Sequence, residues 1–113
     1  MEILRLIEIP LTVNPRGISA RFLIDRPDVQ VANLVVEPGQ TVEAHVTPVD
    51  VFFYVVEGRG TISIGDETGE VKAGDIIVSP AKIPHGLKAA PDSTFSVLVV
   101  KTPNPKKLKQ AGC

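Results

Sequence analysis

The chain has two histidines, His45 and His85, and they are its strongest candidates for chemistry. A neutral imidazole either binds a divalent transition metal or exchanges hydrogen bonds with a ligand. Pro84 directly precedes His85, and Pro48 follows His45 by three residues, so the backbone is restrained beside both rings. The pair therefore indicates a metal site, the polar anchors of a small-molecule pocket, or residues without a direct role in a protein whose function lies elsewhere.

Other reactive residue types form weaker patterns. Arg59 lies between two glycines but precedes a strand rather than a helix N-terminus, which favours a tight turn over a phosphate loop. Ser63 and Ser79 lack the spaced His and Asp of a nucleophilic triad. The acidic residues of segment 66–70 are expected in an exposed hairpin loop. Arg21 could hold an anion at the mouth of a pocket, although a surface role is favoured.

The elements that must position the histidines are β-strands. Runs rich in Val, Ile, Phe and Thr recur every eight to twelve residues and are closed by Gly, Pro, Asn or Asp. This pattern predicts an all-β domain, either a sandwich or a barrel. The strands are expected at Leu4–Ile9, Ile18–Ile24, Val29–Glu37, Thr41–Val46, Val51–Glu57, Gly60–Ile64, Glu70–Lys72, Asp75–Ser79, His85–Ala89 and Thr94–Lys101.

Composition limits the classes of partner. The 113 residues suit one domain, and the net charge of −1, from 12 basic and 13 acidic residues, disfavours nucleic acid as a partner. No apolar run reaches the ~20 residues that span a bilayer, so no membrane partner is expected. The lone cysteine, Cys113, and the absence of a signal peptide after Met1 favour the cytoplasm. Residues 104–113, which are rich in lysine, are expected to form a C-terminal tail, as a short helix or disordered.

Two spaced motifs resemble those of the cupin family. The first cupin motif is G-x5-H-x-H-x3,4-E-x6-G, and segment 39–58 follows its spacing from Gly39 to Gly58. His45 occupies the position of the first motif histidine. Thr47 replaces the second histidine, and Val51 replaces the glutamate.

The second cupin motif is G-x5-P-x-G-x2-H-x3-N, and segment 74–89 follows it with Pro80 and His85 in place. Lys82 stands where the family has glycine, and Ala89 stands where it has asparagine. The two motifs occur in the family's order, so the resemblance is specific, and functional roles transfer only to His45 and His85.

The resemblance implies a single antiparallel β-barrel over residues 1–113, of the jelly-roll or double-stranded β-helix type. Motif spacing brings both histidines to one cavity, where they are expected to be metal ligands, with manganese, iron, nickel or zinc as candidates. Two imidazoles alone hold a metal weakly, because three or four protein donors are usual. The expected ligand-pocket residues are Thr47, Val51, Phe53 and Val55.

Three functions remain open for such a barrel. The leading one is binding of a small organic ligand, with or without a weakly held divalent metal at His45 and His85. The second is a metal-dependent enzyme of the dioxygenase or isomerase class. The third is a non-catalytic sensing or accessory module. A homodimer is also expected, paired through the apolar strands at Ile3–Ile9 and Val97–Val100.

Overall fold

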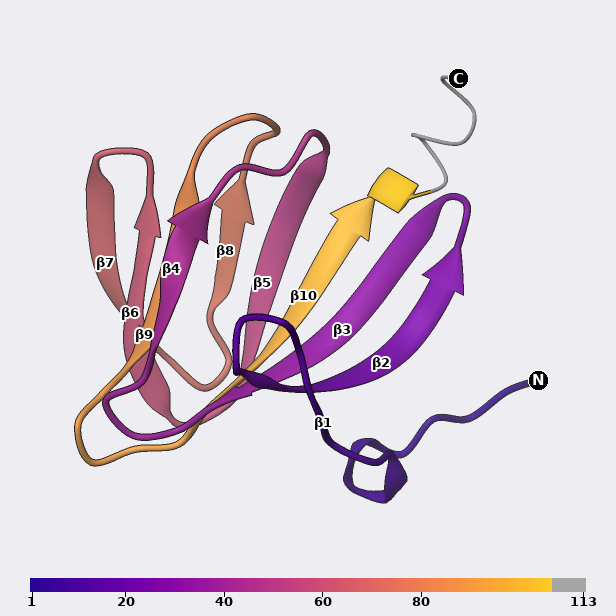
Figure 1. Ribbon diagram of the computed structural model, residues 1–113, viewed down its shortest axis with the longest axis horizontal. Coiled ribbons are helices and arrows are strands. Elements are labelled where there is room, and N and C mark those ends of the chain that lie inside the picture. Colours follow the sequence, from indigo (N-terminus) through magenta and orange to yellow (C-terminus); the bar gives the residue numbers. More distant parts are fainter. Residues whose placement is uncertain (107–113) are drawn as a thin grey trace.

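The computed structural model describes residues 1–106, and these form an all-β fold of two antiparallel sheets (Figure 1). A short 3₁₀ turn, η1 (Leu6–Glu8), precedes the strands. No helix within residues 1–106 is long and apolar enough to cross a membrane. The strands are β1 (Thr12–Val13), β2 (Ser19–Arg26), β3 (Val29–Val36), β4 (Thr41–His45), β5 (Asp50–Glu57), β6 (Arg59–Ile64), β7 (Glu67–Lys72), β8 (Ile76–Ser79), β9 (His85–Ala89) and β10 (Phe95–Thr102).

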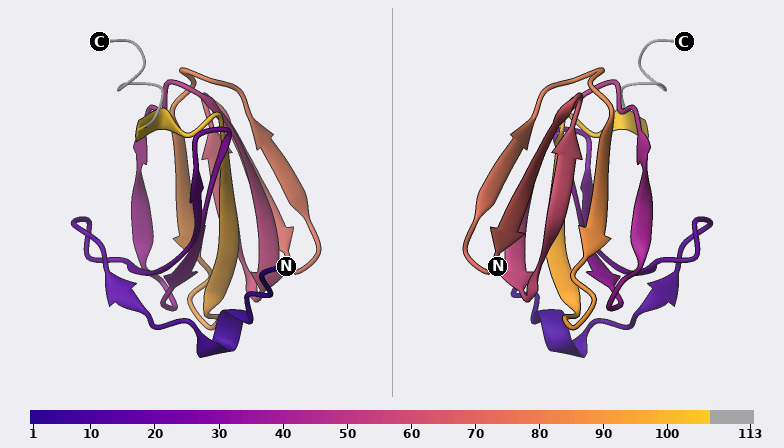
Figure 2. Two further views of the ribbon diagram at one scale, coloured as in Figure 1. Left: turned by 90° about the vertical axis from the view of Figure 1, so that its right-hand side faces the viewer. Right: turned by 90° about the vertical axis from the view of Figure 1, so that its left-hand side faces the viewer.

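The two sheets form the layers of a jelly roll. One sheet has the order β1-β2-β3-β10-β5-β8, and the other has the order β4-β9-β6-β7. Figures 1 and 2 show the smaller sheet beside the larger, curved one. The all-β antiparallel prediction is confirmed. Within the described residues, however, the hydrogen-bonded ladders remain two separate sheets and do not close into one continuous barrel.

Strand β5 shows how the sequence places its side chains. Val51, Phe53 and Val55 are buried between the sheets, whereas Phe52 and Tyr54 are exposed on the outer face. Because successive side chains of a strand point to opposite faces, this period of two separates core from surface. The inward residues join one apolar cluster with residues of β3, β4, β6, β9 and β10.

The strand expected at Leu4–Ile9 is wrong. This segment is irregular apart from η1, and the apolar side chains of Ile3 and Ile7 are exposed. A strand needs a neighbour for its backbone hydrogen bonds, and the open edge of β2 is already paired with β1 at Thr12–Val13. The segment is tied down instead by Arg21, whose Nε donates to the carbonyl oxygen of Ile9 over 2.8 Å.

The supposed edge strand at Val97–Val100 is also placed differently. It forms part of β10, which pairs with β3 on one side and β5 on the other. Its apolar content therefore reflects a central position in the sheet. Just after the C-terminal end of β10, Asn104 is fully buried, and its backbone N–H donates to the Pro27 carbonyl oxygen. The expected tail therefore does not begin at residue 104. The remainder of that tail, 107–113, lies outside the described residues.

Lys82, which stands where the cupin motif has glycine, adopts an unusual backbone conformation. Lys82 has a φ of 69°, in the left-handed region that favours glycine, and the family motif places glycine there. Its backbone N–H donates to the carbonyl oxygen of Thr47 over 2.8 Å. This bond connects the loop before β9 to the loop after β4, so the chain segments that carry the two histidines are joined at that end.

Candidate functional site

The two histidines meet between β4 and β9. His45 is the last residue of β4, His85 is the first of β9, and the two are directly paired across the strands. Their ring centroids lie 4.5 Å apart, with an angle of 71° between the ring planes. Residues 40 positions apart in the sequence are therefore in edge-to-face contact.

A β-bulge turns His45 toward this contact. Val42 pairs with Leu87 and His45 pairs with His85, so two residues of β4, Glu43 and Ala44, lie opposite one residue of β9. If β4 continued in strict alternation from buried Val42, His45 would face outward instead. Ala44 is accordingly exposed and His45 half-buried.

Gly86 is the residue opposite the bulge. A Cβ atom at this position would lie 3.1 Å from the Val42 carbonyl oxygen and 3.2 Å from the Ala44 nitrogen. Both are backbone atoms, which cannot rotate away as a side chain can. Glycine at position 86 therefore permits the close approach of the bulged backbone.

His85 is buried and has defined partners. Its Nδ1 lies 3.2 Å from the Ser79 hydroxyl oxygen, and its ring centroid lies 5.4 Å from that of Phe53. The hydroxyl group beside this ring belongs to Ser79, a residue that was not among the expected pocket residues. Burial, and then the charge of nearby His45, lower the pKa of His85 from 6.5 to about 4. The ring is therefore uncharged at neutral pH.

His45 is also shifted toward its neutral form. Burial is the main reason that its pKa lies below 6.5, and the positive charges of Arg16 and Lys101 act in the same direction. Its Nδ1 lies 3.2 Å from the carbonyl oxygen of Glu43, a contact that partly opposes the shift. Two neutral imidazoles thus present ring nitrogens to the same space.

That space is a cavity of about 400 Å³ between the sheets. Its floor and walls are mostly apolar, and the histidines lie on the side formed by β4 and β9. Such a volume and lining are typical of small-molecule sites. The apolar lining includes Phe22, Leu34, Val42, Phe53, Leu87 and Val99.

The charged residues of the cavity share one sign. Arg16, Lys101 and Lys106 line it, and none of its lining residues within the described chain is acidic. Arg16 lies in the β1–β2 turn, where the Asn14 side-chain oxygen accepts hydrogen bonds from the backbone N–H groups of Arg16 and Ile18. The charged residues that line the cavity are therefore all basic, and most of the remaining lining is apolar.

The expected pocket residues divide into two groups. Phe53 lines the cavity together with the two histidines. Val51, Val55 and Thr47 are buried, but they are not among the residues that line it. Strands β2 and β3, which lie outside both motifs, supply much of the wall.

Sequence reasoning missed the basic residues of the cavity. Lys101 continues the inward alternation of Val97 and Val99 along β10, a signal that could have been used. Arg16 comes from a turn, and nothing in its sequence spacing places it near a histidine. Arg21, considered for an anion site, donates instead to Asn33 and to the N-terminal segment.

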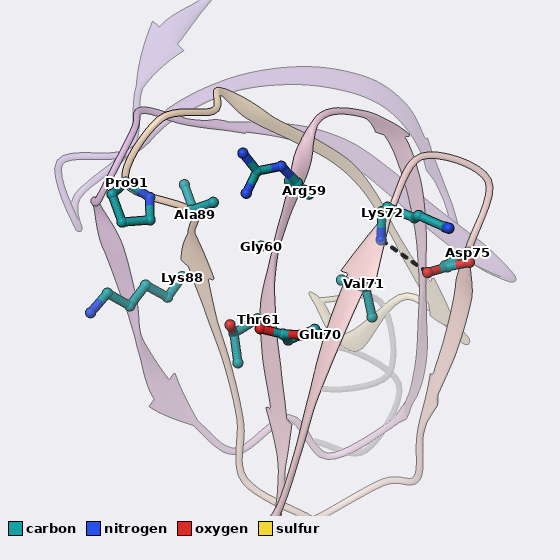
Figure 3. A pocket seen from close by; sticks show the side chains of 11 residues that line it. Arg59, Gly60, Thr61, Glu70, Val71, Lys72, Asp75, Lys88, Ala89 and Pro91 are labelled. Carbon is teal, nitrogen blue, oxygen red and sulfur yellow. Dashed lines mark hydrogen bonds between the residues drawn. The ribbon is translucent and has the colours of Figure 1, made fainter.

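A second hollow lies on the outer surface of the smaller sheet (Figure 3). It measures about 590 Å³ and exceeds the inner cavity in volume. Its charges are mixed: Asp75 accepts a hydrogen bond from the Lys72 backbone, and Arg59 pairs with Asp92 over 2.6 Å. The inner cavity is the better candidate because it combines enclosure with buried polar groups.

The residues present do not fit the resident metal that cupins commonly carry. The described residues contain no group of three His, Cys, Asp or Glu side chains that could hold an ion. Val51 offers no donor atom, and Asp50 is exposed, with its carboxylate accepting a backbone N–H from the β8–β9 loop. Two imidazoles beside Arg16 and Lys101 leave a divalent cation short of ligands and close to like charge.

Comparison with known proteins identifies the family. Residues 33–101 match the family model described as the cupin domain. The chain belongs to the cupin family. This cupin is 34% identical over 59 residues to the uncharacterized protein MJ1618 of Methanocaldococcus jannaschii, an alignment covering 52% of this chain and 46% of that protein. It thus spans about half the length of that curated relative.

Solved structures agree on the fold of this cupin. An RmlC-like cupin from Shewanella frigidimarina superposes with a TM-score of 0.83 at 16% identity, covering 96% of each chain. The polyketide cyclase RemF from Streptomyces resistomycificus superposes with a TM-score of 0.81 at 22% identity, covering 97% of this chain and 93% of that one. At these identities the likeness concerns the fold alone.

The buried histidine makes a pH dependence of stability testable in this cupin. Unfolded His85 takes up a proton near pH 6.5, whereas the folded residue does so only near pH 4, so the free energy of unfolding should fall as the pH drops through that interval. A His85→Gln variant lacks this titration. Between about pH 7 and about pH 4.5, the native protein should lose roughly 2 kcal/mol more than the variant. Urea unfolding measures both, and equal losses would contradict a depressed pKa.

Proposed function

We propose that this cupin binds a small organic anion, a carboxylate with an apolar body, in the cavity beside His45 and His85. The observation that carries the proposal is the charge inventory of the cavity. Its charged lining residues in the described chain are Arg16, Lys101 and Lys106. Low-dielectric walls strengthen the attraction of such a site for an anion.

Each kind of residue in the lining suits a different part of the ligand. Phe53, Leu87 and Val99 offer an apolar surface for the body of the ligand. The guanidinium of Arg16 is suited to a carboxylate because its planar fork makes two parallel hydrogen bonds. The neutral imidazoles of His45 and His85 can each donate or accept, so they suit a hydroxyl or carbonyl oxygen on the ligand.

This assignment favours ligand binding over the metal-dependent enzyme. A divalent cation would have two imidazole donors and cationic neighbours, whereas an organic anion would find complementary charge. The structural neighbour RemF is named as a polyketide cyclase, which supports a small organic molecule as the kind of ligand this fold accepts. A sensing or accessory role uses the same cavity and needs no catalytic step.

The charge requirement can be tested with two ligands of almost equal shape. Phenylacetate should bind at least about tenfold more tightly than the uncharged phenylacetamide, because only the acid gains charge-assisted hydrogen bonds. Arg16→Met should remove most of this preference. Arg59→Met, which alters the outer hollow, should leave the preference unchanged. Chemical-shift titrations followed at the histidine and Phe53 signals give both affinities and location.

Two results would overturn the proposal. The first is equal binding of acid and amide to the native protein. The second is a preference that survives in Arg16→Met. Titration of ZnCl₂ or NiCl₂ alone provides a further arm: tight binding of either ion, lost in His85→Ala, would support the metal-centred alternative instead.

We further propose that this cupin forms a homodimer through the outer face of β5 and β8. Five apolar side chains are exposed there on neighbouring strands: Phe52, Tyr54, Val56, Ile76 and Val78. Phe52 pairs with Val78 and Tyr54 pairs with Ile76, so the patch is continuous. Burying this patch against a second copy would remove it from water.

Light scattering at micromolar concentration should therefore give the mass of two chains. Val78→Lys should shift the protein to monomer, because it places a charge within the apolar contact. Val13→Lys changes a similarly exposed valine on β1 and should leave the dimer intact. A monomeric native protein would refute the dimer, and a dimer that persists in Val78→Lys would refute this face.

A further inference from the structure

Lys101 is one of two lysines, with Lys106, that line the cavity. It lies on the inward-facing register of β10, opposite Gln30 of β3 and Val51 of β5. The residue is half-buried and lines the cavity with both histidines. No hydrogen bond or ion pair connects its side chain to another residue of the described chain (1–106). Its amine can therefore reach a bound ligand without first leaving a protein partner.

The surroundings of Lys101 make its ammonium group easier to deprotonate. The ionisable side chains that line the same cavity are Arg16, Lys106, His45 and His85, and none of them carries a negative charge at neutral pH. Burial lowers the pKa of Lys101, and the charges of Arg16 and then Lys106 lower it further. A desolvated lysine next to other cations is the usual setting of a nucleophilic amine.

We propose that Lys101 forms an imine with the carbonyl group of a 2-oxo acid held in this cavity. The inference rests on the proposed function, because the cavity must first accept such a ligand. It adds a covalent role for one side chain, which neither the cupin motifs nor the histidine pair implies. The class of ligand follows from the chemistry: a carbonyl carbon for the amine and a carboxylate for Arg16.

The step is balanced by the loss of water. The lone pair of neutral Nζ attacks the carbonyl carbon, the C=O π electrons move to oxygen, and that oxygen takes up a proton to give a carbinolamine. The nitrogen then loses one proton, and the hydroxyl group takes up a proton and leaves as water while the nitrogen lone pair forms the C=N bond. The resulting protonated imine loses the second nitrogen proton to give the imine. His45 and His85 are uncharged near neutral pH, so either ring can accept or return a proton during these transfers.

Arg16 has a separate part in this arrangement. A carboxylate paired with the Lys101 ammonium would hold the lysine in its charged, unreactive form. A guanidinium stays protonated at all relevant pH values and binds carboxylates in a bidentate manner. Carboxylate binding at Arg16 would therefore orient a 2-oxo acid and leave the amine of Lys101 free for the carbonyl carbon.

Reductive trapping tests the inference directly. The native protein is incubated with phenylpyruvate and sodium cyanoborohydride near neutral pH, and the adduct is located by peptide mass mapping. Lys101 should be labelled at least about tenfold faster than the exposed Lys88, because binding holds the carbonyl beside the amine. Lys101→Arg, which keeps the charge, should lose this labelling. Lys88→Arg is the matched control and should keep it.

Phenylacetate binding separates the two proposals. This acid has no ketone, so it reports whether the cavity accepts an aryl carboxylate. If phenylacetate binds to native protein and to Lys101→Arg, yet phenylpyruvate labels Lys101 no faster than Lys88, the imine inference is overturned and the binding function stands. If phenylacetate does not bind and Lys101 is not labelled selectively, both are overturned. Selective labelling of Lys101 that phenylacetate slows by competition supports both.

Discussion

The contact between His45 and His85 depends on a single irregularity in β4. Two residues of that strand, Glu43 and Ala44, occupy the length that Gly86 alone occupies in β9. The bulge reverses the side-chain alternation, so a histidine that would face solvent turns toward the interior. The glycine opposite leaves room for the bulged backbone, because a Cβ atom there would lie 3.1 Å from the Val42 carbonyl oxygen and would be crowded.

Once the two rings share the interior, the electrostatics of the cavity follow. Burial removes His85 from solvent and places it beside His45, and both effects lower the pKa of His85, so the ring stays neutral. Arg16 and Lys101 add positive charge without an acidic partner among the lining residues of the described chain. A further cation is unfavourable in such surroundings, whereas an anion balances their charge. Val51, which replaces the motif glutamate, contributes to this excess of positive charge. It pairs with Lys101 across the strands, where a carboxylate would have balanced the charge of the lysine.

The sequence predicted the fold and the histidine pair for identifiable physical reasons. Alternation in Val51–Glu57 determines which side chains of β5 are buried, and the spacing of two motifs brings His45 and His85 together. Alternation fails at the bulge, because a two-residue period cannot reveal where a strand gains an extra residue. It also failed for Leu4–Ile9, whose apolar side chains suggested a strand although β1 already occupies the edge of β2.

The basic residues that line the cavity were not predictable in the same way. Arg16 reaches it from a turn that is fixed by Asn14, and that position depends on tertiary packing rather than on a local pattern. Burial of Val97–Val100 was visible in the sequence, but its cause was not, since a central strand and an associating edge strand have similar composition. Whether an apolar strand lies in the centre of a sheet or at its edge depends on which strands pair with it.

The role of Gly86 can be measured by NMR through the contacts between the His45 and His85 ring protons. The native protein should show strong nuclear Overhauser effects between the two rings, consistent with centroids 4.5 Å apart. In Gly86→Ala these effects should weaken or vanish, while the contacts between Phe53 and its core neighbours persist. Gly69→Ala, at a position with nothing within 4 Å of the added carbon, should behave as the native protein does. Ring contacts of native strength in folded Gly86→Ala would contradict the claim that this glycine and the bulge opposite it bring the histidines together.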